Sequence, residues 1–324
     1  MNQSNNTNDS SDALEDIFMP DETFDMVFYI SCYCVGAFVF LGTLFVLIIL
    51  GRINLETQDI TQIFVKSQTL FDCLTGLFLV ICTLPVHFKS NSEVVCKFFA
   101  SQFLLWTCLI GSTYNMILIT SERYIMVIHP IWHKSNFTKN LAHICIVAVF
   151  MLGLIFGLVK IPTSSVRHGR CMIMHFWIED YLRDYYVMAL IITMQFLPEI
   201  YICVAYSKMF VTLRKRREVV ATYSTTANEV LSKAQFNVLA TMAIASLCLV
   251  LCYLPATILT IYAMANKVPK FLIFPLKLSN VLMFVNCGLN PIVYTLKYEW
   301  FKREIVKVFK RANNENDNNG IELH

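Results

Sequence analysis

The sequence predicts an all-α membrane protein: a seven-transmembrane helix bundle followed by a short amphipathic eighth helix on the inner leaflet. The first observation is composition, because 56% of the 324 residues are hydrophobic and 15% are charged, against about 45–50% and roughly 25% in an average soluble domain. The second is seven charge-poor runs, each long enough to cross about 30 Å of hydrocarbon as a helix. Only helices or closed barrels satisfy the backbone in lipid, and these runs lack the period-2 alternation of barrel strands.

The seven predicted spans are separated by polar segments. The second is the least uniform, because Lys66 and Asp72 lie within it. The N-terminal residues lack the basic and apolar regions of a cleavable signal peptide, so we expect the first run to be a membrane helix. The spans cover residues 27–50, 62–86, 98–127, 141–161, 185–209, 234–265 and 271–296.

The domain organisation follows from these spans. Residues 1–26 are expected to form a disordered extracellular tail, and residues 27–296 the bundle. In residues 297–311 the apolar side chains share one helical face and most basic ones lie elsewhere, which is typical of a helix on an anionic inner leaflet. Residues 312–324 are expected to form a free cytoplasmic tail. Membrane lipid is thus an expected partner, and nucleic acid is not.

The distribution of charge predicts the orientation. Lys and Arg gather in loops, helix ends and the C-terminal tail that lie inside if the N-terminus lies outside. The first 26 residues carry seven acidic side chains and no Lys or Arg. Sequons at Asn2, Asn5 and Asn8 are candidate glycosylation sites in the same tail. We therefore expect a multi-pass protein of the cell membrane with an extracellular N-terminus.

Several polar residues lie where a membrane helix is expected to be apolar. Asp72, Ser112, Asn286 and Asn290 fall within the second, third and seventh spans. Such residues usually face the bundle interior or a water-filled cavity. A carboxylate surrounded by neutral oxygens is also a hard-cation environment. Residue types alone thus predict a buried polar cluster, without showing which helices face each other.

Several motifs occur in a fixed order along the spans. They are Glu122-Arg123-Tyr124, Asn290-Pro291 with Tyr294, Cys252 to Pro255, Asp72, Pro198 with Tyr206, and Cys96 with Cys171. Together they resemble the rhodopsin-like (class A) G-protein-coupled receptor family over residues 27–311. The chain departs from the family pattern at Thr43, where Asn is usual, and at Tyr253, where Trp is usual. Cys96 also lies 27 residues before Arg123, about two more than usual.

The resemblance implies roles for these residues. Cys96 and Cys171 would form a disulfide. The four polar residues of the spans would surround water and a possible structural Na⁺, with no other cofactor expected. A heterotrimeric G protein would be the intracellular partner. The residues implied in its coupling are Glu122, Arg123, Tyr124, Ile131, Tyr206 and Tyr294.

The resemblance also places an extracellular ligand among the third, fifth, sixth and seventh helices. The implied lining residues are Gln102, Leu105, Trp106, Tyr253 and Phe284. Leu105 stands where amine receptors carry Asp, and Phe284 where opsins carry the Schiff-base Lys. With the bipolar second outer loop and the acidic tail, this favours a peptide over an amine. Glu199 is an unusual acid in the fifth helix, read as an interhelical or water-facing hydrogen bond or as a ligand contact.

No enzyme motif is present: we find no nucleophile elbow, no H-E-x-x-H and no phosphate loop. The expected function is therefore ligand-dependent activation of a G protein. One alternative is a transporter or channel, although the inverted repeats of many transporters are not visible here. The other is a seven-helix scaffold that does not couple to G proteins.

Overall fold

The computed structural model describes residues 22–52, 59–87, 92–167, 170–172, 180–223, 226–265, 269–297 and 306. This part of the chain is helical apart from short connecting segments and one antiparallel hairpin, in which Val166 pairs with Cys171. The helices are α2 (Glu22–Gly51), α3 (Ile60–His87), α4 (Glu93–Val95), α5 (Phe103–Ile128), α6 (Pro130–Asn136), α7 (Lys139–Leu158), α8 (Asp180–Ile191), α9 (Leu197–Tyr223), α10 (Thr226–Ala265) and α11 (Lys270–Lys297). Two π-helical turns, η2 (Cys96–Ala100) and η3 (Ile192–Phe196), and strands β1 (Ser165–Arg167) and β2 (Arg170–Met172) complete the set.

Seven of these helical segments are long and apolar enough to cross a membrane, which confirms the predicted number of spans. The third span joins α4, η2 and α5, and the fifth joins α8, η3 and α9. α2 begins at Glu22, earlier than the predicted start of the first span. Most of the predicted eighth helix, 297–311, lies outside the described residues, as do 1–21 and 312–324.

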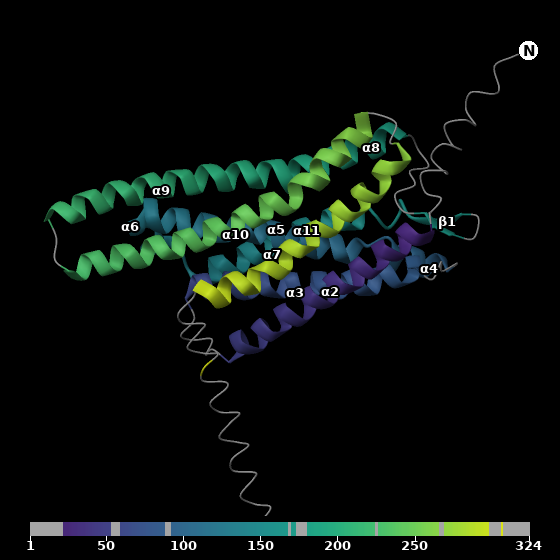
Figure 1. The fold of residues 1–324 in the computed structure, drawn as a ribbon. Coiled ribbons are helices and arrows are strands. Elements are labelled where there is room, and N and C mark those ends of the chain that lie inside the picture. Colours follow the sequence, from purple (N-terminus) through teal and green to yellow (C-terminus); the bar gives the residue numbers. More distant parts are fainter. Residues whose placement is uncertain are drawn as a thin grey trace, which may run out of the picture.

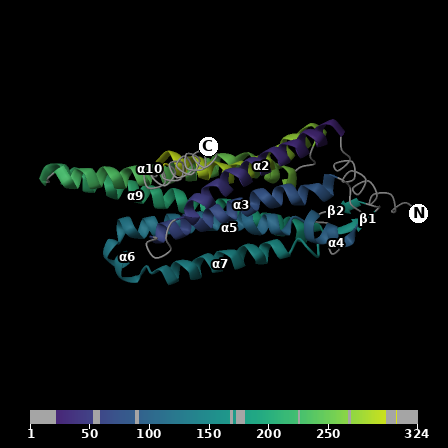
Figure 2. The same cartoon turned by 90° about the horizontal axis from the view of Figure 1, so that it is seen from below.

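The bundle has two distinct ends. Strand β1 and helix α4 lie at one end, close to where the chain enters α2, and we call this the hairpin end (Figure 1). Helix α6, the last residues of α9 and the first residues of α10 lie at the other, which we call the α6 end. There, α9 and α10 extend past the rest of the bundle in both views (Figures 1 and 2).

Helix α5 lies at the centre of the packing. It contacts α3, α7 and α9, while α2 packs on α3 and α11, and α10 packs between α9 and α11. α7 approaches α5 closely because Gly153 and Gly157 face it. Small residues spaced in this way let membrane helices approach backbone to backbone.

Two helices carry π-helical turns toward the hairpin end. η2 interrupts the third span directly after its start, and Gln102 then adopts φ 62° and ψ 24°, in the left-handed region, before α5 begins. The extra residues between Cys96 and Arg123 are accommodated here, because a π turn absorbs an inserted residue without disturbing the rest of the helix. η3 lies in the fifth span, just before Pro198.

Candidate functional site

A buried polar network joins α3, α5 and α11 in the middle of the bundle. The Ser112 hydroxyl donates to Asp72 Oδ1 at 2.6 Å, and the Asn290 amide donates to Asp72 Oδ2 at 2.8 Å. All three side chains are at most 2% exposed. The structure therefore brings together three of the four polar residues singled out in the sequence. The fourth, Asn286, is also buried, but within the described chain its Oδ1 has no hydrogen-bond partner.

The network contains two residues that sequence reasoning missed. Gln68 Nε2 donates to Ser112 Oγ at 2.7 Å and lies 3.3 Å from each oxygen of Asp72. Asn115 Nδ2 donates to Gln68 Oε1 at 2.9 Å. Gln68 precedes Asp72 by four residues, a spacing that places both side chains on one helix face. That spacing was the available signal.

A second cluster surrounds the Glu122 carboxylate toward the α6 end. Arg123 Nε lies 3.3 Å from Glu122 Oε2, and His133 Nε2 lies 3.3 Å from Oε1. The Thr61 hydroxyl donates to the same Oε1 at 3.1 Å. The carboxylate is 2% exposed, so a buried charge is surrounded by a cation, an imidazole and a hydroxyl from α5, α6 and α3. Sequence reasoning had not included Thr61 or His133.

The other residues implied in coupling lie around this cluster. Tyr206 is buried in the apolar core at this end, and Tyr124 packs against the same core. Ile131, at the second position of α6, is 87% exposed. The side chain of Tyr294 lies outside the described residues.

The five residues implied in ligand binding occupy the other half of the bundle. Leu105, Tyr253 and Phe284 share one buried cluster, with Trp106 packed against it. The Tyr253 hydroxyl lies 3.2 Å from the Thr113 hydroxyl of α5. Gln102 reaches the same region, because its Oε1 accepts from Trp106 Nε1 at 3.4 Å.

A lysine that sequence reasoning missed also belongs to this region. Lys160 follows α7, is 4% exposed and places its Nζ 4.3 Å from the centre of the Trp106 ring. Burial lowers the pKa of this ammonium group from 10.5 to about 7, because desolvation penalises the charged form. By contrast Glu199 is only partly buried, and its Oε1 has no hydrogen-bond partner in the described residues.

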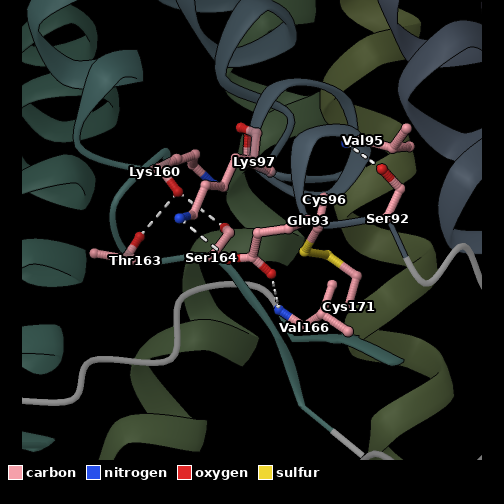
Figure 3. The surroundings of a disulfide bond; sticks show 11 residues. Ser92, Glu93, Val95, Cys96, Lys97, Lys160, Thr163, Ser164, Val166 and Cys171 are labelled. Carbon is pink, nitrogen blue, oxygen red and sulfur yellow. Dashed lines mark hydrogen bonds and ion pairs between the residues drawn. A yellow bond between two sulfur atoms is a disulfide. The ribbon is translucent and has the colours of Figure 1, made fainter. Parts of the chain in front are cut away.

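The disulfide fixes the hairpin over the end of the third span (Figure 3). Cys96 and Cys171 are bonded, with their Cα atoms 5.5 Å apart, which confirms the predicted pair. The Glu93 carboxylate accepts from the backbone N–H of Val166 at 2.9 Å and pairs with Lys97 at 3.1 Å. The hairpin is thus tied to the helix by one covalent and one polar contact. The sequons at Asn2, Asn5 and Asn8 lie outside the described residues.

Seven spans, a Cys-tethered hairpin, an interior polar network and a buried Glu–Arg pair define a class: the seven-helix membrane receptors. Sequence comparison agrees, because the model of the family "7 transmembrane receptor (rhodopsin family)" matches residues 42–294. The chain belongs to this family. It is therefore a multi-pass G-protein-coupled receptor and not an enzyme.

Individual relatives are distant. Human trace amine-associated receptor 8 is 22% identical over 273 residues, which cover 76% of this chain and 75% of the relative. Mouse melatonin receptor type 1A is 22% identical over 278 residues, 83% of this chain and 76% of the relative. The trissin receptor of Drosophila melanogaster is 26% identical over 161 residues, 48% of this chain and 23% of the relative.

Proposed function

We propose that the chain is a cell-surface receptor that binds an extracellular ligand and activates a heterotrimeric G protein. The hairpin end then faces outward with the N-terminus, and the α6 end faces the cytosol. One observation carries the proposal: a buried Glu122–Arg123 pair lies at the α6 end, and α6, whose His133 contacts Glu122, presents the exposed apolar side chain of Ile131. A receptor that recruits a partner needs an element with two arrangements and an exposed surface for that partner. The buried ion pair is a candidate for the first, and the exposed residue of α6 is a candidate for the second.

Charge at the α6 end supports an intracellular partner. Arg214, Lys215 and Arg216 are exposed in the last ten residues of α9, the helix that extends past the rest of the bundle at the α6 end (Figure 1). Basic side chains at this position suit an acidic protein surface or the anionic inner leaflet. Ile131 would fill an apolar notch on the same partner, while the basic run fixes the orientation.

The ligand we propose is a peptide rather than an amine. An amine needs a carboxylate in the pocket, and in this region α5 presents the buried apolar Leu105. Lys160 beside Trp106 adds a cationic group in its protonated form, which disfavours a cationic ligand. The names of two relatives refer to trace amines and melatonin. The apolar side chain of Leu105 cannot pair with a cationic amino group, so this chain lacks the amine-binding pattern.

The test is ligand-free nucleotide exchange, measured on membranes that contain the full chain together with one purified G protein of each class. We expect exchange above that of receptor-free membranes with at least one class. Ile131→Ala should reduce it several-fold at equal surface expression. Ile155→Ala, at a residue of α7 that is 61% exposed on the bundle surface, is the control and should have no effect. No exchange with any class would favour the scaffold or transporter alternatives.

A further inference from the structure

The hydrogen bonds around Asp72 bear on what this carboxylate can bind. An ionised carboxylate offers about four lone-pair positions. In Asp72, Oδ1 accepts from Ser112 and Oδ2 from Asn290, and both oxygens face Gln68 Nε2 at 3.3 Å. Each of the two oxygens therefore accepts one short hydrogen bond, and both share a longer contact with the Gln68 amide.

The Gln68 amide fills the space between Asp72 and Ser112. Its nitrogen carries two hydrogens: one is directed to Ser112 Oγ at 2.7 Å, and the other is shared by the two Asp72 oxygens. The side chain is fully buried. The positive end of a protein dipole thus stands against the carboxylate and the hydroxyl, the two oxygens that a cation at this site would use first.

The amide could offer a cation its oxygen only by turning over, and its neighbours oppose this. Gln68 Oε1 accepts from Asn115 Nδ2 at 2.9 Å, and the same Nδ2 donates to the Phe64 carbonyl at 3.0 Å. Asn115 Oδ1 accepts from the Ser67 hydroxyl at 2.9 Å. Turning Gln68 alone would place two amide nitrogens against each other. Turning Asn115 as well would place its oxygen against the Phe64 carbonyl.

The donor set therefore does not fit the Na⁺ that the family resemblance implied for Asp72. We propose that the side-chain amide of Gln68 takes the place of this ion, so that the receptor's polar network is closed by the protein itself and does not respond to sodium. The feature that favours a bound species is the unpartnered Asn286 Oδ1. In the described residues no hydrogen bond connects Asn286 to Asp72, so Asn286 is not part of the closed network around that carboxylate.

The proposal does not depend on the ligand or the G protein, because it can be tested through stability. An ion that binds only the folded state raises Tm. We would compare the Tm of the purified full chain in about 0.15 M NaCl with that in N-methylglucamine chloride of equal ionic strength. For the parent chain we expect the same Tm in both salts.

The informative variant is Gln68→Leu, which removes the amide and leaves Asp72 with vacant acceptor positions. It should gain a sodium-specific rise in Tm of about 2–4 °C when sodium is about ten times its Kd. Adding Asp72→Asn should abolish the gain. Gln62→Leu changes the same residue type in α3, where the amide accepts from the Asp59 N–H, and should gain nothing.

Two outcomes would overturn the proposal. One is a sodium-specific rise in Tm of the parent chain that Asp72→Asn removes. The other is a folded Gln68→Leu variant with the same Tm in both salts. Should Gln68→Leu fail to fold, Asn115→Leu provides the second test. This substitution frees Gln68 to turn its oxygen toward a cation. The Tm of the variant should then depend on sodium, while the Tm of the parent chain does not.

Discussion

The imidazole Nε2 of His133 lies 3.3 Å from Oε1 of Glu122, although the two residues belong to different helices. The position of the imidazole is set by packing: its ring stacks on Phe137 at 5.3 Å between centroids, and Phe137 meets Phe64 of α3 edge-on at 6.3 Å. Glu122 is therefore held from outside its own helix as well as by Arg123. Because Thr61 and His133 also contact this carboxylate, Glu122 keeps polar partners when Arg123 moves away.

We predict that His133→Phe lowers ligand-free nucleotide exchange. Phenylalanine can retain the stack on Phe137, but it removes the polar contact to Glu122, so the buried carboxylate depends more on Arg123. A weak ion-pair contact is worth about 0.2–1 kcal/mol, which shifts a two-state equilibrium roughly 1.4–5-fold toward the state in which the Glu122–Arg123 pair is closed. Exchange should be measured at matched surface expression. His143→Phe, at an exposed position on α7, is the control. Basal exchange equal to that of the parent would show that His133 does not influence the Glu122–Arg123 pair.

We predict that Lys160 makes thermal stability depend on pH. The pKa of this group is about 7 in the folded chain and 10.5 in its ordinary environment. Between these values the unfolded state binds more protons, so stability rises with pH, by up to about 1.4 kcal/mol per pH unit. Tm measured from pH 7 to pH 9 should rise in the parent chain relative to Lys160→Met. Parallel curves for the two proteins would contradict the lowered pKa.

We predict that Gly157→Ala destabilises the bundle while Gly42→Ala does not. A Cβ at Gly157 would lie 2.3 Å from Thr107 Oγ1 and 2.7 Å from the Phe103 carbonyl, so α7 would have to move away from α5. Overpacking of this kind costs about 1–3 kcal/mol. A Cβ at Gly42 meets no atom within 4 Å, and alanine there gains helix propensity. Tm in detergent and surface expression should fall only for the first variant.

We predict that Tyr114→Phe loosens the contact between α5 and the fifth span. In η3 the Leu197 N–H bonds the Ile192 carbonyl five residues back. The next acceptor in that pattern is the Thr193 carbonyl, and its donor position is Pro198, which has no N–H. The Tyr114 hydroxyl donates to that carbonyl at 2.9 Å. Its removal should lower stability by about 1–3 kcal/mol, because an acceptor is left unpaired. An unchanged Tm would show that the carbonyl finds another partner.

The seven spans were predictable because lipid leaves the backbone few choices. A charge-poor run of twenty or more residues must be helical to satisfy its own hydrogen bonds, so length and hydropathy sufficed for α2 and α7. The π turns were not predictable, because one inserted residue barely changes hydropathy. The anomaly in sequence was the long spacing between Cys96 and Arg123, which indicated an insertion without locating it.

Site residues were predictable where their type is costly in lipid. They were not predictable where their role depends on how the helices pack against each other. Asp72 and Arg123 attract attention because an intramembrane charge needs a reason. Gln68 and Asn115 are neutral. Their importance comes from the rotation of α3 relative to α5, which cannot be deduced from one sequence alone. Lys160 lies at the end of the predicted span 141–161, where a lysine resembles an ordinary cation at a helix end. Only the fold reveals that the chain after α7 turns this ammonium group over Trp106.

The two π turns have a consequence for how this receptor can diversify. One residue added to a regular α-helix rotates every side chain beyond it by about 100° around the helix axis. A wider π turn takes up the added residue locally, so the helix on either side keeps its register. η2 and η3 both lie on the hairpin side of their helices, away from Arg123. An insertion or deletion there therefore alters the side chains of that turn and leaves the rest of the helix unchanged. The hairpin end can thus vary in length between related chains while the end that carries Arg123 keeps its register.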